Sequence, residues 1–216
     1  MIIDNFDAVL ESNIFWNPKN FKKGEHCYCV FILKRPKDNK EHELIKIECN
    51  TFMHYFLAYK KEDLWDKIEF IKKYCDTFNA RAYISLNPVK ISRLLKIFTT
   101  FCYNDLNITY ETPGLLNLVN TNENFCNAAI RSEELNYYLI DCDTLIPKEQ
   151  NQVKQIINLG LKNDIILASF PTLHGIHYIT TPFNTSFYHD NLKTMTNISA
   201  HCVPNPKVLL YYNSDC

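Results

Sequence analysis

Glycine is scarce in this sequence, with only 4 among 216 residues. Loops that wrap around phosphate groups use glycines at close spacing, and neither GxGxxG nor GxxxxGK[ST] occurs here. The GxSxG pattern of a nucleophile elbow is missing as well. These absences argue against a dinucleotide-binding dehydrogenase, a P-loop nucleotide hydrolase and an α/β-type serine hydrolase.

The chain also lacks a net charge of one sign and a long apolar run. Its 23 lysine and arginine residues nearly balance its 24 aspartate and glutamate residues, which leaves a formal net charge of -1. Without a global basic field, any nucleic-acid site must be a local patch. No apolar run approaches the roughly 20 residues that span a bilayer. The first eleven residues have no basic segment of the signal-peptide type, so we expect no membrane partner.

Disulfide bonds are not expected, although the chain has nine cysteines. An odd number cannot pair completely, and a chain of this length can bury a core without disulfides. Thiols that act as small buried apolar groups in a reducing compartment fit this composition better. With 46% hydrophobic and 22% charged residues, the composition predicts a single compact domain over 1–216 in the cytoplasm.

Apolar residues follow a strand period and a helix period in turn along the chain. Segment 27–34 is rich in β-branched and aromatic residues, whereas Leu64, Ile68, Ile71 and Cys75 fall at helical spacing. The same reasoning predicts strands at 27–34, 44–48, 80–86, 137–143, 164–169, 176–181 and 207–212, and helices beginning near 61, 88 and 147.

This succession predicts an α/β or α+β fold. The stretch 104–127 is rich in asparagine and threonine and contains Pro113 and Gly114, so it predicts an irregular connection. On this prediction the connection would join sub-modules at 1–103 and 128–216. The polar segment 190–206 is also predicted to be irregular.

Two aspartates close one of the apolar strands, in the order Asp141, Cys142, Asp143. Side chains alternate across a strand, so both carboxylates should lie on one face, roughly 6.5–7 Å apart. A divalent cation would relieve their repulsion, and oxygen ligands of this kind suit Mg²⁺ or Mn²⁺. A solvated strand end is the alternative interpretation, because DxD is a short pattern with many chance matches.

A second group of polar residues, Thr172, His174, Gly175 and His177, lies about thirty residues further on. Gly175 permits a tight turn or the close approach of a ligand, and His177 is the second residue of the predicted strand that follows. The two histidines differ by three positions, which does not by itself make a zinc pair, and no CxxC accompanies them. A histidine at a strand start is otherwise a hydrogen-bonded polar residue.

In combination, these features resemble the archaeo-eukaryotic primase superfamily, in particular its small primase-polymerase domains from phages and plasmids. The shared order is an apolar strand, Asp-x-Asp, a helix, a strand, and Gly-x-His opening another strand. Segment 138–143 is similar to the family's acidic motif and segment 175–179 to its histidine motif, within a match over about 137–183.

The resemblance implies an N-terminal α/β module packed on a C-terminal RRM-like module. It implies that Asp141 and Asp143 bind catalytic Mg²⁺ or Mn²⁺, and that His177 contacts the triphosphate of an incoming nucleotide. Family members also carry a third acid on a later strand, but the last predicted strand, 207–212, contains none. The further candidate nucleotide-binding residues are Thr172, Gly175 and Arg81.

On this resemblance we expect a metal-dependent nucleotidyltransferase, or a nucleotide-binding relic of one. The expected partners are a nucleoside triphosphate and single-stranded nucleic acid, in phage DNA replication within the host cytoplasm. The alternative is a non-catalytic phage accessory protein that binds nucleic acid or a host protein through the same cleft. A metal-assisted phosphoesterase or nuclease that uses Asp141, Asp143, His174 and His177 is a third option.

Overall fold

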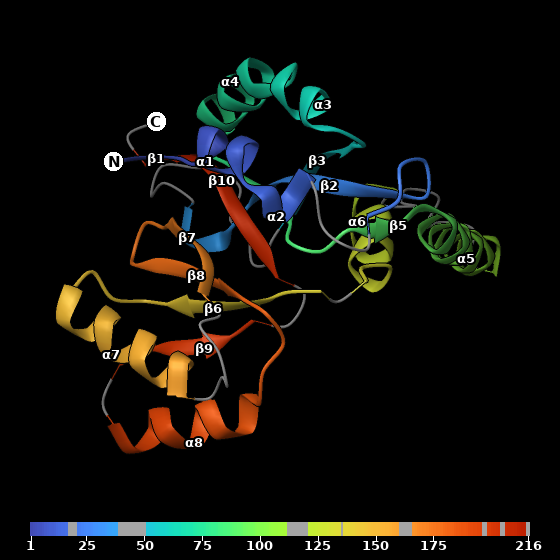
Figure 1. Cartoon of the computed structure of the whole chain (residues 1–216). Helices are drawn as coiled ribbons and strands as arrows, with labels where there is room; N and C mark the ends of the chain where they lie inside the picture. The colour runs from blue at the N-terminus through green and yellow to red at the C-terminus, as the bar shows by residue number, and fades with distance from the viewer. Residues whose placement is uncertain are drawn as a thin grey trace.

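Two antiparallel sheets form the framework of the chain (Figure 1). The computed structural model describes residues 1–16, 21–38, 51–111, 121–134, 136–159, 166–195, 198–203 and 206–214. The first sheet has the order β1-β10-β4-β2-β3, with β5 also paired to β2, and the second has the order β7-β8-β6-β9. The strands are β1 (Ile2–Asp4), β2 (His26–Lys34), β3 (Thr51–Ala58), β4 (Arg81–Ser85), β5 (Val89–Lys90), β6 (Tyr138–Cys142), β7 (Ile166–Pro171), β8 (Ile176–Thr180), β9 (Ala200–Cys202) and β10 (Lys207–Asn213).

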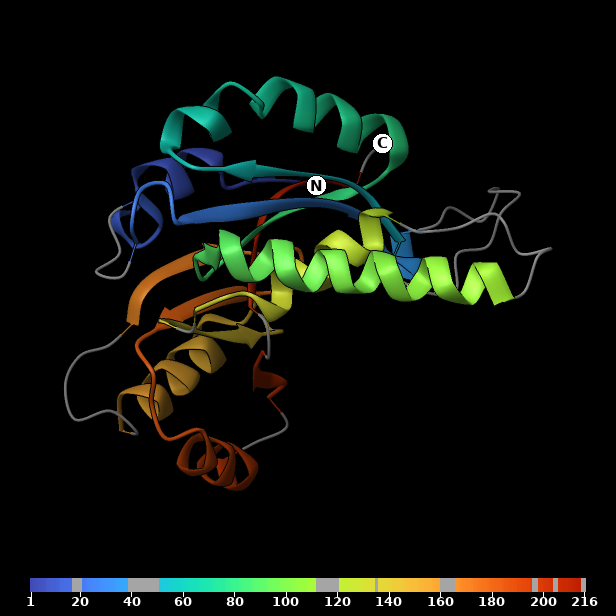
Figure 2. The same cartoon turned by 90° about the vertical axis from the view of Figure 1, so that its right-hand side faces the viewer.

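Helices cover both faces of the first sheet. Strand β2 is buried throughout, and its alternate residues enter two different cores. Tyr28, Val30 and Ile32 pack with the first four helices, whereas Cys29 and Phe31 pack with α5 and α6. Figure 2 shows the strands between α3 and α4 above and α5 below. These helices are α1 (Phe6–Glu11), α2 (Asn13–Trp16), α3 (Lys61–Trp65), α4 (Ile68–Phe78), α5 (Ile91–Glu111) and α6 (Thr121–Arg131), with a 3₁₀ turn, η1, at Pro36–Asp38.

Two helices pack on one face of the second sheet. Ile140 and Cys142 of β6 pack with α7 (Pro147–Leu159) and α8 (Thr185–Met195). Leu139, one position earlier, joins the core of the first sheet instead. Because side chains alternate along a strand, Asp141 also faces the first sheet. Figure 1 shows α7 and α8 on the side of the second sheet that faces away from the first.

The predicted mixed α/β class is confirmed. Predicted strands at 27–34, 80–86, 137–143, 176–181 and 207–212 correspond to β2, β4, β6, β8 and β10. The predicted strand at 44–48 lies outside the described residues. Among the described residues, no helix is both long enough and apolar enough to cross a bilayer.

The predicted irregular connection at 104–127 is wrong at both ends. Helix α5 continues to Glu111 and α6 begins at Thr121; residues 112–120 lie outside the described residues. Asparagine and threonine disfavour helices only weakly, and packing overrides that preference. In α6, Phe125 and Cys126 provide this packing, because both are buried against β2 and β3.

The predicted sub-modules at 1–103 and 128–216 do not follow the sheets. Strand β10, at the end of the second sub-module, pairs between β1 and β4 in the first sheet. Segment 190–206, predicted to be irregular, contains the end of α8 and strand β9. Buried Leu192 and Ala200 give these polar stretches an anchor in the second core.

A buried carboxyl group, that of Glu133, lies beside the first sheet. Burial raises its pKa from the ordinary 4.5 to about 8, against the opposing effects of Lys207 and Asn87. Between these two values the folded chain holds a proton that the unfolded chain has lost. Because of this group, the free energy of unfolding should fall as the pH rises from about 5 to 8.

Glu133→Gln should flatten that loss, because an amide resembles the protonated carboxyl group. We expect a melting temperature a few degrees above the wild type at pH 8 and close to it at pH 5. Thermal unfolding of both proteins at four pH values measures this, with Glu69→Gln on the exposed face of α4 as the control. Parallel pH profiles for Glu133→Gln and the wild type would contradict the prediction.

Candidate functional site

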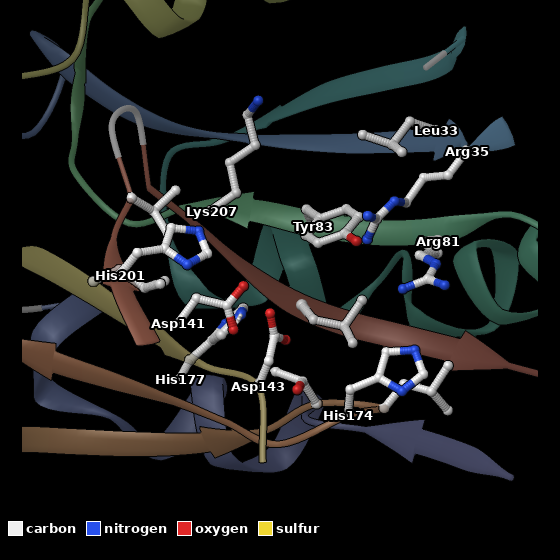
Figure 3. A pocket seen from close by; sticks show the side chains of 15 residues that line it. Leu33, Arg35, Arg81, Tyr83, Asp141, Asp143, His174, His177, His201 and Lys207 are labelled. Carbon is white, nitrogen blue, oxygen red and sulfur yellow. Dashed lines mark ion pairs between the residues drawn. The ribbon is translucent and has the colours of Figure 1, made fainter. Parts of the chain in front are cut away.

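A cavity of about 440 Å³ lies where the first sheet faces the second (Figure 3). Its volume is in the range of small-molecule sites, about 300–1,000 Å³. Six side chains from β2, β4, β10 and the segment after β2 form one wall: Leu33, Arg35, Arg81, Tyr83, Lys207 and Leu209. The opposite wall comes from β6, β8, β9 and the β7–β8 turn, and it contains both predicted acids.

Asp141 lies between two histidines in a row across the second sheet. It is directly opposite His177 of β8 on one side and His201 of β9 on the other. Nε2 of His177 and Oδ1 of Asp141 are 3.5 Å apart. Antiparallel residues in direct opposition have side chains on the same face, and all three line the cavity. The row therefore gives this end of the cavity one carboxylate flanked by two imidazoles.

Burial and, to a smaller extent, the neighbouring His201 lower the pKa of His177 from 6.5 to about 4. This low pKa favours a neutral ring in the folded chain near pH 7. Its Nδ1 atom is buried and has no hydrogen-bond partner among the described residues. A neutral imidazole keeps a lone pair on one nitrogen, which is the form that binds metal ions.

Asp143 follows two positions after Asp141 and lines the same cavity. Its backbone N–H donates to the carbonyl oxygen of Ser199 at 2.8 Å, which fixes the start of β9 against the end of β6. Figure 3 shows the two carboxylates and the His201 ring directed toward the same region. The prediction that both acids share one face is therefore reproduced.

Gly175 supports the site without lining the cavity. A Cβ atom at this position would lie 1.8 Å from the carbonyl oxygen of Cys142 and 2.8 Å from the backbone nitrogen of Thr144. Its own carbonyl oxygen accepts the N–H of Thr172 at 3.0 Å. Gly175 was predicted to contact a nucleotide. In the structure its small size serves the packing of the β7–β8 turn on the end of β6, while Thr172 does line the cavity.

Arg81 lies on the opposite wall and is already paired. Its Nε donates to Oδ2 of Asp38 at 2.8 Å and its Nη2 donates to Oδ1 of the same carboxylate. The guanidinium carbon is 4.2 Å from the centre of the Tyr212 ring. The bidentate pair with Asp38 makes Arg81 a structural residue, and its side chain also lines the cavity.

Two further cations on this wall were not predicted. Arg35 follows β2 and is half-buried. Lys207 begins β10, and its amino group lies over the rings of Phe31 and Phe52 at 5.1 and 5.6 Å from their centres. Burial lowers the pKa of Lys207, and Figure 3 shows its side chain running away from the acids. Arg35 and Arg81 are therefore the cations better placed for a ligand in the cavity.

The structure thus brings together Asp141, Asp143, His177, Thr172 and Arg81 of the predicted residues. It adds His201, whose signal in the sequence is the short alternation of Ala200, His201 and Cys202 inside a polar segment. Among the described residues, no set of three or more histidine, cysteine and acidic side chains is already arranged around a metal position.

Comparison with protein-family models, with curated proteins and with solved structures finds no match for this chain. Function is therefore inferred from the chemistry of the cavity, because a fold class alone does not determine function.

Proposed function

We propose that the cavity binds a nucleoside triphosphate together with Mg²⁺ or Mn²⁺, and that the chain is a nucleotidyltransferase of the primase-polymerase type. The observation that supports this most is the charge arrangement across one cavity. Asp141 and Asp143 line one wall, and Arg35 and Arg81 line the other. In a metal–triphosphate complex, the cation is attracted to carboxylates and the phosphate oxygens are attracted to guanidinium groups.

The order of elements in the second sheet also supports the proposal. Along the chain it is β6-α7-β7-β8-α8-β9, and in space the strands lie in the order β7-β8-β6-β9. This order matches the split β-α-β arrangement of ferredoxin-like folds, and it supports the RRM-like module that the resemblance implies. On this proposal, the second sheet is the RRM-like module that carries the acids, and the first sheet supplies the phosphate-binding wall.

The donor set fits a divalent cation. Asp141 and Asp143 would hold it, since carboxylate oxygens suit Mg²⁺ and Mn²⁺. When bound, such an ion neutralises charge on the triphosphate and stabilises the charge that develops during transfer. His177 is neutral, so it adds no positive charge beside the carboxylates. Arg81, held in place by Asp38, would orient the phosphate chain.

Isothermal titration calorimetry with a non-hydrolysable nucleoside triphosphate tests this proposal. We expect binding in the presence of Mn²⁺ and loss of binding in excess EDTA, because the acids repel the triphosphate when no cation lies between them. The absence of binding heat with Mn²⁺, Mg²⁺ and all four nucleotides would contradict the proposal.

Arg35→Gln should weaken nucleotide binding about 10- to 100-fold, since a hydrogen bond to a charged group is worth about 1.5–3 kcal/mol. Arg35 makes a better probe than Arg81, whose loss would also leave Asp38 buried without its partner. The same calorimetry measures the change. Arg93→Gln, an exposed arginine on α5 outside the cavity lining, is the matched control, and equal affinities for the two variants would contradict a role for Arg35.

A nucleotide-binding protein without transfer activity is the second candidate. It is favoured by the commitment of Arg81 to Asp38 and of Lys207 to two aromatic rings, which leaves fewer cations for a nucleic-acid strand. Primer synthesis or extension on single-stranded templates separates the two candidates. Nucleotide binding without any new phosphodiester bond supports the second.

A further inference from the structure

We propose that His177 and His201 are metal ligands on either side of Asp141. The cation site would then combine nitrogen and oxygen donors and prefer a first-row transition-metal ion such as Mn²⁺ to Mg²⁺. This inference rests on the proposed function, because it concerns the same cation. It replaces the direct contact between His177 and a triphosphate that the sequence suggested.

The register between the strands places the three side chains next to one another. Asp141 is the Cα partner of His177 in β8 and of His201 in β9, so three ligand-type side chains stand next to one another on one face. Directly opposed residues in antiparallel strands have Cβ atoms about 4.5–5.5 Å apart. That spacing lets neighbouring imidazole and carboxylate groups converge on a single ion.

The distance between the His177 ring and the Asp141 carboxylate is the second observation. The 3.5 Å between Nε2 of His177 and Oδ1 of Asp141 exceeds the usual hydrogen-bond length of about 2.7–3.2 Å. Two donors bound to one ion at about 2.0–2.2 Å lie about 3.4 Å apart at a tetrahedral angle and about 3.0 Å apart at the 90° angle of an octahedral ion such as Mn²⁺. The observed separation is close to the first value, and a shift of about half an ångström would bring it to the second.

Backbone hydrogen bonds hold His201 in its place in the row. The N–H of Asp143 donates to the carbonyl oxygen of Ser199 at 2.8 Å, and the N–H of Val203 donates to that of Leu139 at 2.9 Å. These bonds lie on both sides of His201 and fix β9 against β6. The His201 side chain is itself exposed and lines the cavity beside Asp141.

The donor types set the preference among ions. Mg²⁺ favours an all-oxygen set and retains its water ligands, whereas imidazole nitrogen suits Zn²⁺, Cu²⁺, Fe²⁺ and Ni²⁺ best and Mn²⁺, which also favours oxygen ligands, less strongly. Two histidines beside one carboxylate are therefore a poor set for Mg²⁺. Asp143, just beyond the end of β6, lines the same cavity and would be a second oxygen ligand.

Pulsed electron paramagnetic resonance of the full chain, stripped with EDTA and reloaded with Mn²⁺, tests the inference. Nitrogen-14 is detected only when it is bound to the ion or very near it. We expect coupling from two imidazole nitrogens in the wild type and from one in His201→Gln, with Mn²⁺ affinity about 10-fold weaker in that variant. Competition should show weaker binding of Mg²⁺ than of Mn²⁺.

His174→Gln is the matched control, because His174 lines the same cavity but belongs to the β7–β8 turn and not to the strand row. It should keep both nitrogen couplings. His177→Gln, with its fold checked by circular dichroism, should also retain one coupling. Bound Mn²⁺ without nitrogen coupling would overturn this inference and leave the proposed function standing, whereas no Mn²⁺ binding at all would overturn both.

Discussion

Replacing Asp141 with asparagine should abolish metal-dependent nucleotide binding, with a loss of affinity greater than about 100-fold. Loss of a group that only supports a metal ligand typically costs 10–100-fold, and Asp141 is the proposed ligand itself. It lies directly opposite a residue in each neighbouring strand. The amide keeps the shape of the side chain but loses the negative charge, so the overall fold should be retained.

Calorimetry with Mn²⁺ and a non-hydrolysable nucleoside triphosphate measures the effect. Asp190→Asn, an exposed acid on α8, changes the net charge equally and lies outside the cavity lining. This control should bind like the wild type. If Asp141→Asn binds metal and nucleotide normally, the acids are a solvated strand end, which was the alternative interpretation of the sequence.

Gly175→Ala should destabilise the fold by about 3 kcal/mol or more. Overpacking a well-packed site costs about 1–3 kcal/mol and occasionally more. Here the added Cβ would meet backbone atoms, the carbonyl oxygen of Cys142 at 1.8 Å and the nitrogen of Thr144 at 2.8 Å. Backbone atoms of a paired strand cannot move aside as a flexible side chain can. The β7–β8 turn or the end of β6 would therefore have to shift.

Gly24→Ala provides the matched comparison. Gly24 has φ +84° and nothing within 4 Å of its added Cβ, so the substitution adds backbone strain without a collision. We expect a cost of about 1 kcal/mol there. Urea unfolding of both variants measures the difference, and similar midpoints for the two would contradict the packing role of Gly175.

The acid pair illustrates what the sequence could predict. The two-residue period of a strand was sufficient to place Asp141 and Asp143 on one face, and both line the cavity although Asp143 lies just beyond the end of β6. Predicting that Asp141 lies opposite His177 would have required the register between β6 and β8, which the local sequence pattern does not give. The Gly-x-His element predicted the strand that carries His177 but not its partner.

His201 shows why the remainder was not predictable. Strand β9 has three residues, too few for a clear alternation, and it lies in a polar segment. Its position depends on pairing with β6, about sixty residues earlier in the chain. The position of Arg81 beside Asp38 also depends on contacts between distant segments. Local periodicity carries no information of this kind.

The location of β10 affects the interpretation of the whole site. This strand returns to the first sheet after the second sheet is complete, and it brings Lys207 and Leu209 to the cavity wall. The cavity is therefore built from both ends of the chain, and neither predicted sub-module would form it alone. Although the charges of the whole chain nearly balance, acids and guanidinium groups lie on opposite walls of this cavity.

A crystal structure of the protein with Mn²⁺ and a non-hydrolysable nucleoside triphosphate tests the central claim most directly. We predict anomalous scattering from Mn²⁺ beside Asp141 and Asp143, with the phosphate groups between that ion and Arg81. Nucleotide bound outside the cavity, or Mn²⁺ bound without contact to Asp141, would contradict the claim.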